Sequence, residues 1–510
     1  MKRLTLTGLA LLLVATLNAQ VEDDWKKEIE KSRQSAIDEF ESFKQQAAQE
    51  FENFRRQANE DYAKFMEQAW KMFETQPAVE PPARPKPTVP MVDNTPAPTP
   101  TPSPEGDTRP TVEPVRIPDP VAPPQLPRPD LSQGAERPQP MEPIVPNAVP
   151  MSAAQNVFLY GSPFAFHLEN EQQLKLKDAS EKSVSKMWKQ LSDPSFDHII
   201  AECLQQRDKR NLCDWAYVKL TQQVAEKQCG EGTNEAIVMQ MYLLTQSGYQ
   251  MRIGRDDANH LTLLMGSKEQ IYRHKYFVMD GIKFYLIDRK FNKKGLNIFD
   301  HAFPKEKSLS LVMIQPDLQI DKTEKRTIAS KRYPDVSVTV QTNRNLMNFY
   351  NDYPLSANWD YYSKASLSQV VKESMYPALR QATKGKSELE STNILLNFVQ
   401  TGFQYKTDGE QFGYERPLFP DESLYYPYCD CEDRSILFSC LVRELLGLEV
   451  VLLDYPEHIA TAVCFNEPVK GAYFVLDGKN FVISDPTYIG ADVGECPPKY
   501  RKVSPKVVRF

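Results

Sequence analysis

The stretch YYPYCDCEDRSILFSCLVRELLG, residues 425–447, places two cysteines one residue apart in front of an apolar helical pattern. Apolar residues recur at helical spacing within it, which predicts a helix from about 432 to 446. Asp430 is a suitable N-cap, and Cys431 follows just inside the helix start. A thiol at that place feels the helix dipole and free backbone N–H groups. Both favour the reactive thiolate, and the same N–H groups could stabilise an oxyanion.

A cysteine nucleophile flanked by acidic residues still needs a base, and the chain offers few. It contains 6 histidines, and residues 302–510 contain one, His458, in a stretch that reads as a strand leaving a loop. Asp485 ends a later strand in FVISDPTY, where Pro486 stops pairing. A carboxylate there could accept from the histidine ring and hold its tautomer. The sequence therefore predicts a nucleophile, base and orienting acid made of Cys431, His458 and Asp485.

The neighbouring cysteines also allow other interpretations. A metal site would need a second ligand pair, and the sequence has no second Cys-x-x-Cys or histidine cluster, so neither a metal nor a cofactor is expected. A disulfide between Cys431 and Cys440 is geometrically poor, because nine helical residues separate them. Cys429 could pair with Cys464 or Cys496, and the sequence does not exclude this.

An internal repeat organises the C-terminal part of the chain. FVMDGIKFYLID at 277–288 and FVLDGKNFVISD at 474–485 match at most positions, and each alternates like a hairpin with an Asp-Gly turn. Upstream, EGTNEAIVMQMYLLTQSGYQ (231–250) aligns with DCEDRSILFSCLVRELLGLE (430–449). Three landmarks thus keep order and spacing. They predict a tandem of two related α+β units.

The first unit differs from the second where the chemistry is expected. Gly232 stands where the second unit has Cys431, whereas His260 and Asp288 are retained. Without a thiol these residues cannot perform acyl transfer, and Cys229 is read as a core or disulfide-bonded residue. We therefore expect a non-catalytic first copy, with His260 as a hydrogen-bonded core residue.

DCEDRSILFSCLVRELLG, His458 and SDPTY together resemble the transglutaminase-like superfamily of papain-type folds. The shared pattern is a helix-start cysteine, a strand histidine, and a strand aspartate followed by Pro-Thr, and the resemblance covers roughly 385–495. It implies that Cys431 is the nucleophile, His458 the general base and Asp485 the orienting acid. It also implies a bacterial secreted tandem form with a degenerate first copy. The family histidine is often followed by an aromatic residue, whereas Ile459 follows here, so the resemblance does not name the substrate.

The N-terminal region predicts export and then a long helix. Residues 1–20 read as a secretory signal, with a basic start, an apolar run and a cleavage site after Ala19. An 11-residue repeat of aromatic residues follows from 39 to 71, and this period keeps one stripe on one face of a helix. The stripe either binds a partner, another copy or a membrane surface, or packs on its own downstream domain. Residues 77–150 hold 24 of the 40 prolines and predict a disordered, partly polyproline II tether.

The predicted division of the chain has five parts: a signal peptide (1–19), a long amphipathic helix (20–76), a Pro-rich linker (77–150), a degenerate transglutaminase-like unit (151–320) and a catalytic-type unit (321–510). The formal charge of −7, with no basic face, argues against nucleic acid as a partner.

Two classes of function follow from these features. The first is a secreted or periplasmic cysteine enzyme that cleaves or transfers amide bonds, a peptidase or amidase with water and a transglutaminase with an amine. A protein or peptide substrate is expected, for example a cell-wall peptide. The side chain of Tyr428 or Gln400 is suggested as a donor that helps to stabilise the oxyanion. The second class is a non-catalytic binding or scaffolding protein of the cell envelope with a relic triad. A structural coiled-coil protein is a third, weaker interpretation.

Overall fold

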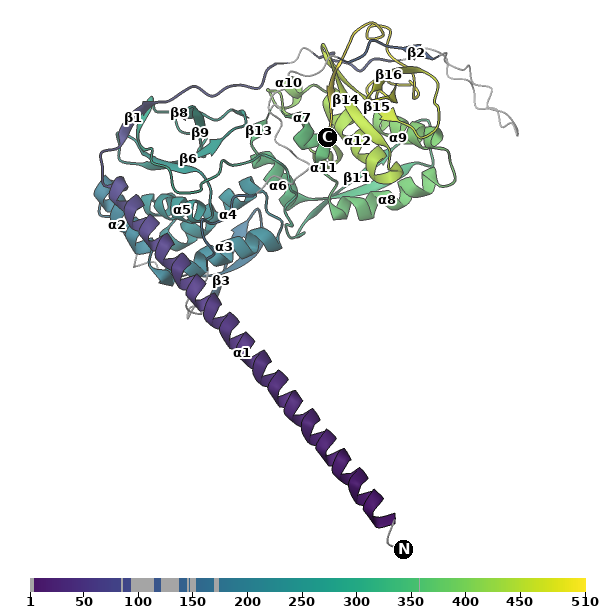
Figure 1. The fold of residues 1–510 in the computed structure, drawn as a ribbon. Coiled ribbons are helices and arrows are strands. Elements are labelled where there is room, and N and C mark those ends of the chain that lie inside the picture. The colour runs from purple at the N-terminus through teal and green to yellow at the C-terminus, as the bar shows by residue number, and fades with distance from the viewer. Residues whose placement is uncertain are drawn as a thin grey trace.

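The structure, a computed structural model, describes the following residues: 4–83, 86–92, 114–120, 137–144, 146, 153–168, 174–356 and 358–510. Before residue 31 it describes the backbone alone. The chain is a mixed α+β protein, as predicted. Two six-stranded sheets, each with helices packed on it, lie side by side, and one long helix projects away from them (Figure 1). Among the helices in the described ranges, none combines the length and apolarity needed to cross a bilayer.

In the described residues, the first unit contains four longer helices, a short 3-10 helix and eight strands. Its elements are β3 (Ala154–Leu159), β4 (Ser162–His167), α2 (Glu181–Leu191), η2 (Pro194–Phe196), α3 (Asp197–Lys209), α4 (Asp214–Cys229), α5 (Asn234–Gln246), β5 (Met251–Arg255), β6 (Leu261–Ser267), β7 (Ile271–Tyr272), β8 (Tyr276–Met279), β9 (Ile282–Leu286) and β10 (Gly295–Phe299).

The second unit begins with a hairpin and continues through seven helices into the second sheet. Its elements are β11 (Thr323–Ala329), β12 (Ser337–Asn343), α6 (Arg344–Asp352), β13 (Leu355–Ser356), α7 (Trp359–Lys364), α8 (Gln369–Thr383), α9 (Glu388–Gly402), α10 (Asp408–Gln411), α11 (Pro420–Tyr425), α12 (Cys431–Leu446), β14 (Glu449–Tyr455), β15 (His458–Cys464), β16 (Ala472–Leu476), β17 (Lys479–Ile483) and β18 (Lys506–Val508).

The two sheets share the order of their central strands. The first runs β10-β5-β6-β9-β8 and the second β18-β14-β15-β17-β16, and every one of these neighbouring pairs is antiparallel. The two predicted hairpins are confirmed. Asp280-Gly281 and Asp477-Gly478 form their turns, and all four residues have positive φ, as a type I′ turn requires. The repeat in the sequence thus corresponds to a repeat of topology.

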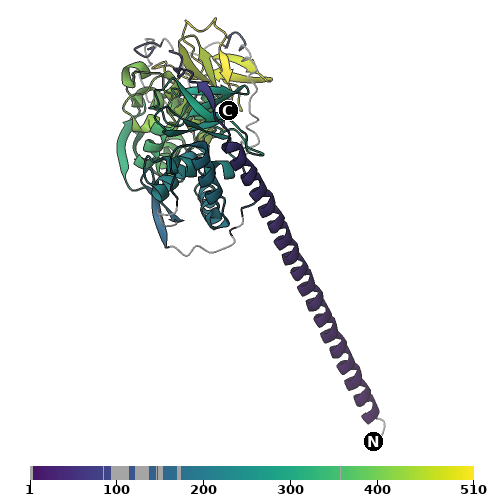
Figure 2. The same ribbon diagram turned by 90° about the vertical axis from the view of Figure 1, so that its left-hand side faces the viewer.

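The long helix α1 (Leu4–Met66) ends earlier than predicted. The helix was expected to reach residue 76, but β1 (Lys71–Glu74) pairs instead with the edge strand β10. Pairing at that edge satisfies backbone groups that a longer helix would leave unused on β10, and it packs Phe73 against the sheet. Figure 2 shows α1 leaving the folded body as a single projecting rod.

The aromatic stripe of α1 is divided between two environments. Near its C-terminus, Tyr62 and Met66 are buried in the core of the first unit, and the Arg55 guanidinium pairs with the carboxylate of buried Asp197. Further toward the N-terminus Phe43 is 68% exposed. Packing on the chain's own domain is therefore confirmed for the last turns, and the partner of the exposed part stays a prediction.

Most described pieces of the Pro-rich region dock on the folded units. β2 (Val115–Arg116) pairs with β16, Ile117 is 1% exposed within a core cluster, and Met141 joins the first core. The expectation of a disordered tether is wrong for these pieces. The non-proline residues between the prolines keep N–H groups and apolar side chains, and sheet edges offer partners for both. Residues 93–113 and 121–136 lie outside the described residues.

Candidate active site

The helix predicted around residues 432–446 is α12, and the candidate site lies at its N-terminus. Asp430 is its N-cap in an extended conformation, and Gly447 ends it in the left-handed region with φ 70°. The helix lies against α9, β14 and β15. Cys431, its first residue, is 1% exposed. The predicted position of the thiol at a helix N-terminus is therefore confirmed.

His458 and Asp485 meet at the start of β15. The Nε2 atom of His458 lies 2.7 Å from Oδ2 of Asp485, and both side chains are buried. The other oxygen of Asp485 accepts from the backbone N–H groups of Thr487, at 2.8 Å, and Tyr488, at 3.2 Å. Tyr500 stacks on the imidazole with centroids 5.1 Å apart and rings inclined by 12°. The ring is thus fixed in orientation, and its Nδ1 makes no hydrogen bond to any described residue.

The thiol lies beside the residue that follows His458. The backbone N–H of Ile459 is directed at Cys431, and the carbonyl of Ile459 accepts from Ser435 Oγ at 3.1 Å. The hydrogen bond of the thiol itself goes to Glu432 Oε2, at 3.2 Å, rather than to His458. The structure therefore joins two of the three predicted residues directly and brings the third to the same end of β15.

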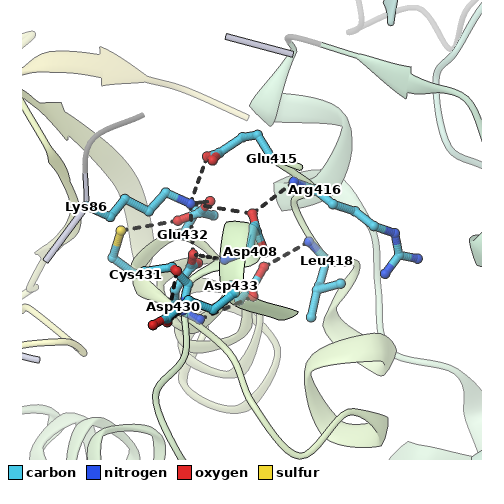
Figure 3. A network of polar contacts seen from close by, with 11 residues as sticks. Lys86, Asp408, Glu415, Arg416, Leu418, Asp430, Cys431, Glu432 and Asp433 are labelled. Carbon is cyan, nitrogen blue, oxygen red and sulfur yellow. Dashed lines mark hydrogen bonds and ion pairs between the residues drawn. The ribbon is translucent and has the colours of Figure 1, made fainter. Parts of the chain in front are cut away.

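A lysine from the Pro-rich region occupies an acidic pocket next to the thiol (Figure 3). The Nζ atom of Lys86 lies 2.8 Å from Asp430 Oδ2, 2.7 Å from Glu415 Oε1 and 3.5 Å from Asp408 Oδ2. It also forms an ion pair with Oε1 of Glu432, whose other oxygen receives the Cys431 hydrogen bond. The side chain of Lys86 is 3% exposed. We call the four carboxylates and their surroundings the acidic pocket.

The electrostatics of the pocket keep the thiol protonated in this arrangement. Burial, together with the Glu432 and Asp430 carboxylates, raises the pKa of Cys431 well above its ordinary value, and Lys86 and the Ile459 amide only partly oppose this. Burial and the Glu432 charge raise the pKa of Glu415 to about 7. Burial works against ionisation of Glu432, yet the Lys86 ammonium lowers its pKa below the ordinary value. The core of the pocket is therefore a Lys86–Glu432 ion pair.

Several carboxylates of the pocket have spacings that could also hold a metal ion. Asp408, Glu415 and Glu432 place one oxygen each within 4.8 Å of one another, as do Asp408, Asp430 and Asp433. An oxygen-only donor set of this kind suits a hard divalent cation. The Lys86 ammonium already lies among these oxygens, so a metal would have to displace it.

The structure also bears on the other sequence predictions for this region. No disulfide forms at any of the cysteines considered for pairing, which are Cys229, Cys429, Cys431, Cys440, Cys464 and Cys496. Gln400 cannot serve an oxyanion, because its amide nitrogen donates to the backbone oxygens of Asp485, Tyr488 and Ala491. It holds the loop after Asp485 instead. The suggested role of Tyr428 stays a prediction.

The first unit has no matching constellation in the described residues. His260 is a surface residue, with its side chain 77% exposed and 3.5 Å from Asp256, so its expected place in the core is wrong. Asp288 is exposed and accepts from the backbone of Lys290. His260 lies in the turn between β5 and β6, one residue before β6 begins, whereas His458 is the first paired residue of β15.

Sequence reasoning missed Lys86 because proline content made its whole region look like a tether. One signal was available. Three acidic residues, Asp430, Glu432 and Asp433, lie together at the start of a largely apolar helix, and buried carboxylates need a compensating cation. Lys86 stands between two prolines, which favour an extended peptide that can present one side chain.

Comparisons with protein-family models, with curated protein sequences and with solved structures gave no match. The resemblance to the transglutaminase-like superfamily therefore stays a prediction from the sequence.

Proposed function

We propose that the second unit is a cysteine-dependent acyl-transfer enzyme, of the transglutaminase-like and papain-type kind, that acts on amide bonds. The observation that carries the proposal is the buried His458–Asp485 pair at the start of β15, with the amide of the next residue directed at the Cys431 thiol. An orienting carboxylate on Nε2 leaves Nδ1 as the nitrogen that exchanges protons. The substrate proposed is a protein or peptide outside the cytoplasm, since residues 1–20 predict secretion or a periplasmic location.

The proposed reaction has two steps. In the first, Cys431 Sγ attacks the amide carbonyl carbon while His458 takes the thiol proton. The C–N bond then breaks, His458 returns that proton to the leaving amine, and a thioester remains. In the second, water or an amine attacks the thioester carbon and gives a proton to His458. The C–S bond breaks, and the proton restores the thiol. Water yields a carboxylic acid, whereas an amine yields a new amide.

The backbone at the start of α12 supports the developing oxyanion. The first N–H groups of a helix have no partner within it and point out of its N-terminus, where the dipole favours negative charge. Because α12 starts at Cys431, these donors lie at the nucleophile itself. The arrangement described must open before reaction, since the thiol is buried and bonded to Glu432.

A non-catalytic binding module is the second candidate. The observation that favours it is the closed pocket: a thiol that is 1% exposed, with a raised pKa, next to a seated Lys86. In that case the histidine pair would be a structural remnant, and the pocket would serve recognition alone.

Alkylation of each cysteine by iodoacetamide between pH 5 and 9, read by mass spectrometry, separates the two candidates. If Cys431 is paired with His458 during opening, its labelling persists below the ordinary thiol pKa of about 8.5 and slows by about tenfold or more in His458→Ala. His260→Ala is the matched control in the first unit and should leave the rate unchanged. Buried Cys429 serves as the internal reference.

The contrary result is equally clear. If the rate for Cys431 rises only at the alkaline end of the range, and His458→Ala labels like the wild type, the imidazole does not activate the thiol. The binding module is then the better assignment.

A further inference from the structure

The occupant of the acidic pocket comes from a segment more than 300 residues away in the chain. Lys86 meets Asp408 and Glu432 across sequence separations of 322 and 346 residues. The described residues on either side of it are short pieces of the Pro-rich region rather than parts of either sheet. The lysine therefore enters the pocket from a separate segment of the chain, as the side chain of a bound peptide would.

The segment 86–92 lies along the second unit in a way that a peptide in trans could reproduce. At one end Lys86 enters the pocket. At the other, the carbonyl of Met91 accepts from the N–H of Ile489 at 2.8 Å, and Val92 forms a parallel bridge with Ile489. Ile489 belongs to the loop that follows Asp485. The segment is thus held at two points. The Lys86 side chain is bound next to the thiol, and the Met91 backbone is bound to the loop that follows Asp485.

The chemistry of the pocket selects a primary ammonium group. A compact –NH₃⁺ offers three donors around one atom, and Nζ of Lys86 is surrounded by carboxylates from Asp408, Glu415, Asp430 and Glu432. A planar guanidinium directs its donors in a fork and cannot converge on four acceptors at one point. Oδ1 of Asp430 makes no hydrogen bond in the described residues although the residue is fully buried. The pocket therefore offers more acceptors than Lys86 uses.

We propose that the acidic pocket is a recognition site for the lysine side chain of an extended, proline-containing peptide, and that Lys86 is its ligand in cis. A lysyl peptide from another protein takes the same place once segment 86–92 leaves. This holds whether or not Cys431 is a nucleophile. If it is one, the pocket sets where a lysine-bearing substrate lies relative to the thiol.

The test uses the full chain with Lys86→Met, which keeps an unbranched side chain of similar length but removes the charge. The probe is a fluorescent, N-acetylated peptide PKPTVPMV, the sequence of residues 85–92, and its twin with norleucine in place of lysine. The lysine peptide should bind Lys86→Met about tenfold or more tightly than the norleucine peptide does. It should bind the wild type more weakly, because tethered Lys86 competes at an effective concentration of about 1 mM. Lys479→Met, which removes an exposed lysine paired with Glu449, is the matched control and should bind like the wild type.

A second measurement needs no variant, and it decides the matter if Lys86→Met does not fold. Brief acetylation of the wild type should modify Lys86 about tenfold more slowly than exposed Lys479, and the lysine peptide at about 10 mM should accelerate Lys86 alone. The proposal is overturned if folded Lys86→Met binds both peptides equally or neither. It is also overturned if the lysine peptide leaves acetylation of Lys86 unchanged. Neither readout depends on the reactivity of Cys431, so this proposal and the catalytic one can fail separately.

Discussion

The two units build the same strand order around different helix starts. In the first, Asn234 is the first residue of α5, and its Oδ1 accepts from the N–H of Leu261 at 2.9 Å. In the second, Cys431 is the first residue of α12, and the N–H of Ile459 is directed at its thiol. Both contacts connect a helix start to the beginning of the second strand of the hairpin that follows it, β6 in the first unit and β15 in the second. The helix starts are thus offset by two residues from the sequence alignment, which places Gly232 opposite Cys431. In the first unit an amide oxygen accepts from the N–H of the residue after the histidine, and in the second the thiol lies at the corresponding N–H.

This difference shows that the fold does not require the candidate site. With Asn234 in place, β6 is held to α5 while His260 remains in solvent. The buried His458–Asp485 pair and the acidic pocket belong to the second unit. The first unit forms the same strand order without them. Burial of so many ionisable groups costs stability, so their presence points to a task other than folding.

The largest difference between the two units is expected when the glycine that ends each helix is substituted. Gly248 and Gly447 both have positive φ, of 91° and 70°. A Cβ at Gly248 would lie 2.0 Å from the backbone oxygen of Gln139, whereas one at Gly447 would meet nothing within 4 Å. Gly248→Ala should therefore cost about 3 kcal/mol, from conformational strain and overpacking together, and Gly447→Ala about 1 kcal/mol from strain alone.

Chemical denaturation of both variants measures the difference. The clash at Gly248 comes from the docked piece 137–144, so a protein in which that piece were loosely attached would show equal costs at the two glycines. Equal costs would thus contradict the tight docking of the Pro-rich region on the first unit.

The two units should also respond to acid in opposite directions. In the first, burial and the Arg289 charge lower the pKa of His274 to about 4. The unfolded chain takes up a proton below pH 6.5 and the folded chain does not, so this contribution is complete above 6.5 and is lost as pH falls toward 4. In the second, the raised pKa of Glu415, about 7, means that the folded chain binds the proton more tightly. Its contribution is present below pH 4.5 and is lost as pH rises through 7.

Melting curves of wild type, His274→Gln and Glu415→Gln across pH 4 to 8 test both signs. His274→Gln should remove a loss of up to about 3 kcal/mol on acidification, as expected for a pKa difference of roughly two and a half units. Glu415→Gln should remove a loss on alkalinisation, for which the pKa difference is of similar size. The opposite sign in either variant would mean that the group is not buried as described.

The parts of this protein that the sequence predicted are those with local signals. The Asp-Gly turns and the N-cap at Asp430 each depend on a few adjacent residues, and both are present. The pairing of His458 with Asp485 followed from two strand ends in one hairpin repeat. By contrast, the pairing of β1 with β10 and the entry of Lys86 into the acidic pocket join segments that are hundreds of residues apart. No periodicity records such contacts, because they depend on which sheet edge or buried charge remains unsatisfied after the units have folded.

The smallest effects are expected at the turns of the two equivalent hairpins. Gly281 and Gly478 occupy the second turn position of the two equivalent hairpins, with φ 76° and 78°, and a Cβ at either would meet open space. Gly281→Ala and Gly478→Ala should each cost about 1 kcal/mol, since the left-handed conformation is the only source of strain. Asn at either position should cost less, because it tolerates that conformation. If denaturation shows costs that differ by more than about 0.5 kcal/mol, the hairpins do not contribute equally, and the repeat is one of topology without equal energetics.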